Sequence, residues 1–323
     1  MAEVAKRISL IDIYEVIVFS SKRHLSEDIG NGKLLREFLD ENNIKFFSED
    51  NINKSKLIDG YIDKSALGIA FGASWVFEKK FVRKFHKPLL DFMGIDLPRY
   101  RGGAHYSWQI LFNNKKGCCN LQIIEGGEDK FHKGPIIKRK IFTFDRHCCI
   151  PIDYFNQAVP IERDFIVEFL NQVKYGKEFK KNMLNEKEST YYPFLHTLIN
   201  GWINWNWNAL EITKFICAFD EPYRGASTRI NNKRVFLKKV FLEKRDKDIH
   251  PFSAGIVVHK DKKFIRVLAK EGTLRVEKVI DENNNDLMKN IKLGDRFYSL
   301  TQDLEKAITF KATYSSKGLK NGQ

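Results

Sequence analysis

The stretch Leu89–Gly103, LLDFMGIDLPRYRGG, combines groups that could take part in chemistry with the turn that would place them. Its apolar start is typical of a buried strand, and a glycine and a Leu-Pro pair end that strand. Arg99 and Arg101 then flank a tyrosine and supply positive charge. In an open α/β sheet the usual ligand site is the crevice beyond the carboxyl ends of the strands. The segment therefore predicts a ligand site with Asp91 and Met93 at the tip of the strand.

The composition indicates a globular protein with room for two domains, because the chain has 323 residues and 43% of them are hydrophobic. The sequence contains no apolar run of about 18 residues that would span a membrane. The first residues lack the apolar core and small-residue cleavage site of a signal peptide, so we expect a cytoplasmic location. The five cysteines show neither a disulfide pattern nor the spacing of zinc ligands.

The formal charge of +14 favours an anionic partner such as a nucleotide-linked substrate, a folate tail or RNA. A lysine-rich surface with no specific partner explains the charge equally well. Charge alone does not choose between the two interpretations.

Strands and helices alternate through the first half of the chain. Strand-like runs are expected at residues 14–21, 44–47, 66–72, 88–93, 118–125 and 135–144, and helices at 31–43, 51–64, 77–86, 103–114 and 151–176. This alternation predicts an α/β domain with a mostly parallel sheet and helices on both faces. Pro160 is expected to break or to start the last of these helices.

The start of the chain departs from the usual pattern, in which a doubly wound domain opens with a strand. Here the first fourteen residues look helical, and the first strand-like run follows them. Two interpretations stay open: the sheet lacks its usual first strand, or Met1 lies inside a longer gene.

The second half reads as a linker and a smaller β-rich domain. Residues 176–204 begin with a run rich in Lys, Glu and Asn, and an amphipathic helix is expected at 208–220. Short β-like runs follow, at residues 225–230, 233–243, 253–259, 263–272, 274–280 and 294–300. Such runs, separated by turn residues, predict a small β-barrel.

Three tryptophans precede this domain, Trp202, Trp205 and Trp207. Their rings could stack on a base or a sugar, and core packing is the simpler interpretation.

Two blocks of the sequence resemble the folate-dependent formyltransferases. LPRYRGG, followed by SWQI, a strand and KGPII, resembles the family signature Asn-x-His-x-Ser-x-Leu-Pro-x-x-Arg-Gly with its later Asp-x-Gly. GWINWNWNALEITKFICAFDEPYRGAST is similar to the region where methionyl-tRNA formyltransferases and their amino-sugar relatives begin their C-terminal domain. The resemblance implies a Rossmann-like formyltransferase domain at 1–175, a linker at 176–204 and a C-terminal OB-like β-barrel domain at 205–318.

The family carries a formyl group from 10-formyltetrahydrofolate to a primary amine, with an Asn and a His at the formyl oxygen and an Asp that orients the His. Counted from Pro98, the Asn and His positions fall on Asp91 and Met93, and the Asp position, two residues before Gly134, falls on His132. A carboxylate donates no hydrogen bond unless it is protonated, and a thioether can neither donate to oxygen nor relay a proton. Because one lost oxyanion donor costs about 100- to 1,000-fold in rate, we expect the usual mechanism to fail.

Other groups nearby offer a replacement. The acidic loop EGGEDKFHKGP is longer than in the family, so Asp129 could supply the carboxylate with His132 as the base. Asp91 and His132 could instead form an acid–base pair, and His105 could face the same pocket. The alternative is an abandoned active site, in which these positions have drifted.

The resemblance places the pterin mainly against backbone groups of two segments. The cofactor-binding residues it implies are Phe71, Gly72, Ala73, Ser74 and Trp75, and Ile95, Asp96, Leu97 and Pro98. The substrate-binding residues it implies are Arg101, Gly102 and His105. Trp75 could pack on a ring of the ligand, although an ordinary core aromatic is the simpler interpretation.

Three functions follow from these expectations. The leading one is a 10-formyltetrahydrofolate-dependent N-formyltransferase acting on a nucleotide-linked amino sugar through an atypical active centre. The second is a methionyl-tRNA formyltransferase with initiator tRNA as its partner. The third is a catalytically inactive homologue that binds folate or a nucleotide.

Overall fold

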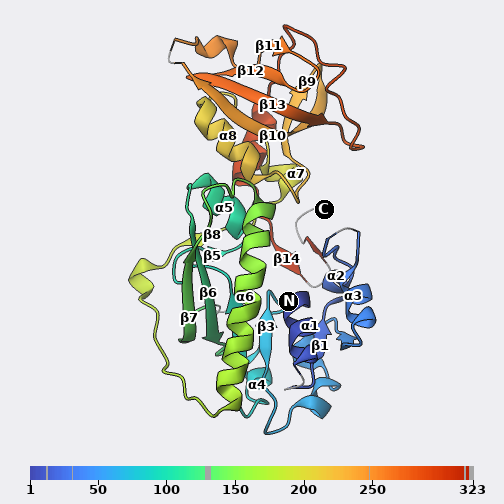
Figure 1. The fold of residues 1–323 in the computed structure, drawn as a ribbon, viewed down its shortest axis with the longest axis vertical. Helices are drawn as coiled ribbons and strands as arrows, with labels where there is room; N and C mark the ends of the chain where they lie inside the picture. The colour runs from blue at the N-terminus through green and yellow to red at the C-terminus, as the bar shows by residue number, and fades with distance from the viewer. Residues whose placement is uncertain (12–13, 31, 128–131, 247, 316–317, 320–323) are drawn as a thin grey trace.

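Two domains stack end to end in the computed structural model, which describes residues 1–11, 14–30, 32–127, 132–246, 248–315 and 318–319. The N-terminal α/β domain occupies the lower half of Figure 1 and the β-rich C-terminal domain the upper half. The long helix α6 (Pro151–Lys174) runs the length of the lower domain.

The N-terminal strands form two separate sheets. One pairs β1 (Ile17–Ser20) with β2 (Lys45–Ser48) in parallel. The other has the order β3-β4-β6-β7 and consists of Ile69–Phe71, Leu90–Met93, Lys116–Ile123 and Ile136–Thr143. Only β3 and β4 run parallel in this second sheet, because β6 is antiparallel to both β4 and β7. The sheet is therefore mixed, where the sequence predicted a mostly parallel one.

The helices include the one expected at the start of the chain. The α-helices of this domain are α1 (Ala2–Leu10), α2 (Lys22–Leu25), α3 (Leu35–Glu41), α4 (Lys79–Val82), α5 (His105–Leu111) and α6. Residues 51–64 form two short 3₁₀ turns, Ile52–Lys54 and Ile58–Tyr61, where one α-helix was expected.

Pro160 does not interrupt α6. It lies on the exposed side of the helix, while Tyr154 and Ala158 before it and Phe165 and Ile166 after it are buried. Packing of both halves of the helix against the core compensates for the hydrogen bond that proline cannot donate.

The predicted linker is fixed against the N-terminal domain. Its β8 (Tyr191–Tyr192) pairs in parallel with β5 (Arg101–Gly102), and Asn182 forms a β-bridge with Ile136. The linker ends in α7 (Thr197–Asn200), at the junction of the two domains.

The C-terminal domain is built on a five-stranded antiparallel sheet with the order β11-β12-β13-β10-β9. These strands are Val257–Lys260, Ile265–Ala269, Gly272–Ile280, Lys233–Arg245 and Ala226–Ile230. Helix α8 (Ala209–Ala218) buries its apolar face against the sheet, as its periodicity predicted. The chain continues with α9 (Thr301–Thr309), which the sequence reasoning missed. It then returns to the lower half of Figure 1, where the short strand β14 (Tyr314–Ser315) lies, and β14 pairs with β15 (Gly318–Leu319).

The edge strands β9 and β11 do not pair with each other among the described residues, so the predicted closed barrel is not seen. A strand was expected at residues 294–300, but this segment runs irregularly between the two edges, with isolated bridges at Arg296 and Tyr298. The N–H of Phe297 donates to the carbonyl of Gly255 beside β11, and Tyr298 exchanges hydrogen bonds with Arg229 of β9. The sheet is thus bridged by loop backbone instead of by a sixth strand.

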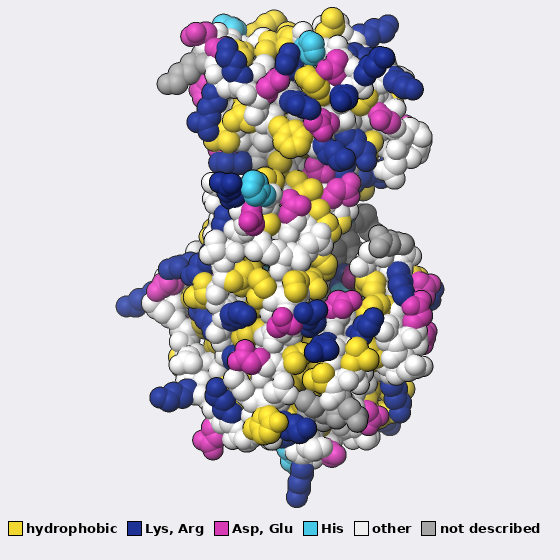
Figure 2. Space-filling view, in the orientation of Figure 1, with side chains coloured by type: hydrophobic (Ala, Val, Ile, Leu, Met, Phe, Trp, Pro, Cys, Tyr) yellow, Lys and Arg dark blue, Asp and Glu magenta, His cyan; other side chains and the backbone are white. Residues whose placement is uncertain are grey.

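Basic side chains are spread over both domains on the face that Figure 2 shows, interspersed with acidic ones. They form no single large patch on that face. Among the described helices, none is both long and apolar enough to cross a membrane.

The bridging segment gives a stability test with a matched control. A Cβ on Gly255 would lie 2.0 Å from the carbonyl oxygen of Phe297, whereas a Cβ on Gly294 would meet no atom within 4 Å; both glycines have φ of +83°. We expect Gly255→Ala to lower the free energy of unfolding by about 3 kcal/mol or more and Gly294→Ala by about 1 kcal/mol. Urea denaturation followed by tryptophan fluorescence measures both, because Trp205 stacks on Phe297. Equal losses in the two variants would contradict this account of the bridge.

Candidate active site

Side chains of β4 point alternately to the two faces of the sheet, and this alternation decides which of them lie outside the core. Leu90 and Phe92 pack with residues of α6 in one hydrophobic cluster. Asp91 and Met93 therefore point to the opposite face of the sheet. A carboxyl group on a strand that is hydrogen-bonded on both sides is placed rigidly.

Asp91 and His132 lie next to each other. Asp91 pairs with Ala70 of β3 and Gln122 of β6. The Gln122 amide donates hydrogen bonds of 3.1 and 2.6 Å to the carbonyls of His132 and Gly134, which fixes the turn that carries the histidine. The His132 Nε2 atom then lies 3.7 Å from the Asp91 Oδ2 atom.

Burial sets the protonation of this pair. The side chains of Asp91 and His132 are only 15% and 8% exposed. Burial raises the pKa of the Asp91 carboxyl to about 7. Burial, together with the neighbouring His105 and Arg101, lowers the pKa of His132 to about 4. Near neutral pH the imidazole is therefore neutral, and a large fraction of Asp91 carries a proton that it can donate.

His105 is the third titratable group of the site. It is the first residue of α5, and its Nε2 atom lies 3.2 Å from the Gly102 carbonyl oxygen, to which it donates. Burial lowers the pKa of His105 to about 4, so this imidazole is also neutral at pH 7. Gly102 cannot be replaced easily, because a Cβ there would lie 1.8 Å from the carbonyl oxygen of Tyr192.

Arg101 joins the turn that carries His132 to the linker. Its Nε atom donates to the His132 carbonyl at 3.1 Å, and its two terminal nitrogens form a forked pair with Glu186 at 2.7 and 2.8 Å. A further bond reaches the Ser189 hydroxyl. Every guanidinium nitrogen thus has an acceptor within the protein. The substrate contact expected of Arg101 stays a prediction, and its observed contacts hold the His132 turn and the linker together.

Met93 does not contribute a group to this pair. It is 7% exposed and packs in an apolar cluster with Ile95, Leu97 and Ile136 and the half-buried Leu184. The thioether therefore fills a core. Asp129 lies outside the described residues, and its predicted role stays a prediction.

The first predicted folate segment, Phe71–Trp75, offers free backbone groups. Gly72 and Ala73 are exposed. The N–H groups of Gly72, Ala73 and Ser74 make no hydrogen bond to other residues in the part of the chain that is described. These donors fit a ligand that is recognised by backbone atoms, as the resemblance implies for the pterin.

Side chains of this segment have partners within the protein. The Trp75 indole donates to the Asp50 carbonyl at 2.9 Å, and its ring packs in a hydrophobic cluster. The Ser74 hydroxyl lies 2.9 Å from the Ser21 hydroxyl and 3.1 Å from the His24 Nδ1 atom. Sequence reasoning missed this network between the ends of β1 and β3.

The second folate segment, Ile95–Pro98, is buried. Asp96 forms ion pairs with Arg139 and, at 2.8 Å, with Lys116, so its carboxylate is committed to the fold. The Asn120 amide donates to the Ile95 carbonyl. Asn120 and Gln122 are fully buried amides at alternate positions of one apolar strand. Two amides inside an apolar strand were a signal in the sequence that the sequence reasoning did not use. In the structure both amides hold neighbouring backbone segments in place by hydrogen bonds.

Comparison with known proteins supports the resemblance. Residues 197–290 match the family model of the formyl transferase C-terminal domain. The methionyl-tRNA formyltransferase of Coxiella burnetii (strain CbuK_Q154) is 26% identical over 240 residues, which are 72% of this chain and 70% of that relative. These two matches support a formyltransferase relationship for this chain.

Solved structures of formyltransferases share the fold. The N-formyltransferase of Helicobacter canadensis, in complex with folinic acid and dTDP-3-aminofucose, matches with a TM-score of 0.58 at 18% identity, over 85% of this chain and 94% of its own. WlaRD, a sugar 3N-formyl transferase solved with dTDP and 5-N-formyl-THF, matches with a TM-score of 0.56 at 20% identity, over 85% and 93% of the two chains.

The raised pKa of Asp91 gives a stability prediction for this protein. A raised folded-state pKa adds stability that is complete below the unfolded pKa, near 4, and is lost as pH rises towards about 7. Asparagine carries no charge at any pH. We therefore expect the free energy of unfolding of Asp91→Asn, relative to that of the parent, to rise by up to about 4 kcal/mol as pH is raised from about 4 to about 8.

Urea denaturation of the parent and the variant at about pH 4 and about pH 8 measures this change in relative stability. The control is Asp40→Asn, an exposed carboxylate on α3. If the two variants showed the same dependence on pH, the Asp91 carboxyl would not be desolvated in the native protein.

Proposed function

We propose that this chain transfers the formyl group of 10-formyltetrahydrofolate to a primary amine. One observation carries the proposal: a buried carboxyl with a pKa of about 7 lies beside a neutral imidazole, on the strand and turn where the family places its catalytic groups. The folate ligands of the two solved relatives support 10-formyltetrahydrofolate as the co-substrate.

Asp91 acts in its protonated form. A neutral carboxyl donates a hydrogen bond to the formyl oxygen as negative charge develops there, which an amide does in the family pattern. A carboxylic acid kept neutral by an apolar site is an established kind of oxyanion donor. The substitution of the family Asn by Asp91 thus preserves donation, provided that the pKa stays near 7.

His132 acts as the base. Its neutral imidazole accepts the proton that the amine loses as the new C–N bond forms. That proton then passes to the folate nitrogen as the bond between this nitrogen and the formyl carbon breaks. The products are a formamide and tetrahydrofolate, and no further reactant is needed. The contacts from Gln122 and Arg101 to the His132 carbonyl hold the base in place.

The backbone N–H groups of Gly72, Ala73 and Ser74 would hold the pterin, with the backbone of Ile95–Pro98 on the other side. The amine acceptor we favour is an amino sugar linked to a nucleotide. The dTDP and dTDP-3-aminofucose ligands of the two solved relatives support it.

Methionyl-tRNA is the second candidate, supported by the methionyl-tRNA formyltransferase of Coxiella burnetii and by the charge of +14. The two differ in salt dependence, because neutralising several phosphates of an RNA backbone makes affinity fall steeply as salt rises. Turnover of a nucleotide-linked amino sugar with little dependence on salt supports the first acceptor. Turnover of methionyl-tRNA alone would replace it.

The pH profile of the reaction tests the roles of the pair. Asp91 must be protonated and His132 neutral, so we expect the acid–base contribution to kcat to fall above about pH 7 and below about pH 4. In Asp91→Asn the donor no longer titrates, and the decline above about pH 7 should disappear. A parent profile that keeps rising well above neutral pH, or an unchanged profile in Asp91→Asn, would contradict the assignment.

Substitutions separate the two groups. We expect Asp91→Ala to lower kcat about 100- to 1,000-fold through the lost oxyanion donor, and His132→Gln to lower it about 100- to 10,000-fold through the lost base. His147→Asn, a change to an exposed histidine beyond β7, is the control and should leave kcat unchanged. If folate bound normally but the parent turned over no amine above background, the chain would be a binding protein and the proposal would fail.

A further inference from the structure

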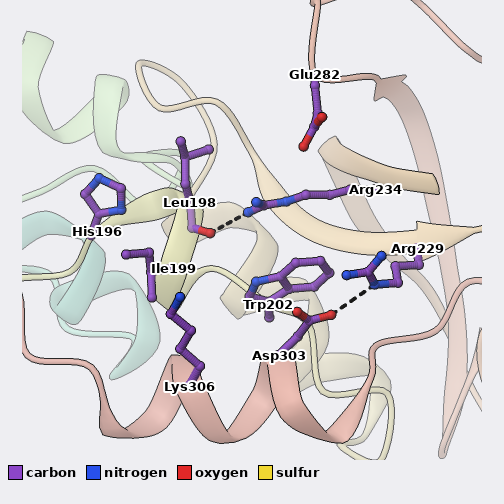
Figure 3. A pocket seen from close by; sticks show the side chains of 9 residues that line it. All are labelled: His196, Leu198, Ile199, Trp202, Arg229, Arg234, Glu282, Asp303 and Lys306. Atoms are coloured by element: carbon purple, nitrogen blue, oxygen red, sulfur yellow. Dashed lines mark hydrogen bonds and ion pairs between the residues drawn. The ribbon is translucent and has the colours of Figure 1, made fainter. Parts of the chain in front are cut away.

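A cavity lies away from Asp91 and His132, where the end of the linker meets the C-terminal domain (Figure 3). Its volume is about 550 Å³, within the range of small-molecule sites. Side chains from the linker and α7, from β9 and β10, from the turn after β13, and from α9 line it. These are His196, Leu198, Ile199, Trp202, Arg229, Arg234, Glu282, Asp303 and Lys306.

Arg234 is held in place by contacts within the protein, and one of its N–H groups has no acceptor among the described residues. Its guanidinium stacks on Trp202 at 4.5 Å from the ring centroid and donates to the Leu198 carbonyl and, at 2.8 Å, to the Ser227 hydroxyl. Its Nε atom is buried and has no hydrogen-bond partner among the described residues. A buried N–H without an acceptor costs free energy, and the described part of the protein does not itself complete the hydrogen bonds of this guanidinium.

Two more basic side chains line the same cavity, His196 and Lys306. The buried Nδ1 atom of His196 also lacks a partner within the described chain. The Lys306 side chain rises from α9 towards Ile199 in Figure 3, and no described carboxylate lies within 4 Å of its ammonium. Arg234 and Lys306 thus carry positive charge that no close ion pair neutralises.

The two acidic residues of the cavity play different parts. Asp303 pairs with Arg229 at 3.0 Å, so these two charges cancel locally. Glu282 forms no ion pair with a described residue and lies across Arg234 from Lys306 in Figure 3. A carboxylate in this position repels an anion that binds near Arg234.

We propose that this cavity is a binding site for a small phosphate-bearing ligand, whose phosphate lies between Arg234 and Lys306 with His196 at its side. A guanidinium, an ammonium and an imidazole that line one cavity are groups suited to a phosphate-bearing ligand. A polynucleotide would need charges spread along a groove instead. The site is independent of the proposed catalytic pair, and a failure here leaves the proposed function standing.

Calorimetry of the full chain with inorganic pyrophosphate tests the site, and ADP serves as a second probe that carries a base. We expect saturable binding of both probes. Lys306→Gln, on an exposed helix position, should weaken pyrophosphate about tenfold through loss of one charge-assisted contact. Glu282→Gln should strengthen it about threefold, since a repulsive charge is removed.

Lys262→Gln is the matched control, because Lys262 is an exposed lysine of the same domain outside the cavity. It should change the affinity by less than about twofold, since distant surface charges are screened. Two results would overturn the proposal: no saturable binding of either probe, or an equal loss in Lys262→Gln and Lys306→Gln. Binding of ADP but not pyrophosphate would also overturn it, because a base and not a phosphate would then be recognised.

Discussion

The burial of one carboxyl group, Asp91, against the imidazole of His132 is the constraint on which the rest of this site depends. In water both groups would be charged near pH 6. The site would then hold an ion pair, and the Asp91 carboxylate would have no proton to donate to an oxyanion. Removal of water reverses this, since burial raises the pKa of the carboxyl to about 7 and lowers that of the imidazole to about 4. The same two residues then offer a neutral acid and a neutral base at pH 7, which are the two groups that the proposed formyl transfer uses.

The scaffold around the pair is built to keep it dry and fixed. Gln122 and Arg101 both bind the His132 carbonyl, one from the neighbouring strand and one from the chain that leads into α5. Arg101 also reaches Glu186 in the linker, so the segment between the two domains takes part in placing a group of the site. The mixed sheet has a similar role, because antiparallel β6 brings Gln122 directly opposite Asp91.

Local patterns predicted much of the fold. The helix at the start, the amphipathic helix α8 and the five strands of the C-terminal sheet follow from apolar periodicity. The direction of the strands was not predicted correctly, because the order of strands and helices along the chain does not show whether two neighbouring strands run parallel. For the site, counting from Pro98 and from Gly134 singled out Asp91 and His132, which lie side by side, while Met93 fills a core. The Arg101–Glu186 pair joins residues 85 apart in a stretch that looked like solvated linker, and no local signal marks such a contact. Protonation was equally hidden, since it depends on burial that only the assembled fold creates.

The titration of the Asp91 carboxyl itself tests the account most directly. Carbon-13 NMR of the full chain with labelled aspartate can follow each carboxyl, and the signal of Asp91 is the one missing from the Asp91→Asn spectrum. The account predicts that this signal titrates with a midpoint near pH 7. A midpoint near 4, the value of an ordinary exposed aspartate, would mean that the group is a carboxylate at neutral pH, and the proposed oxyanion donor would not exist.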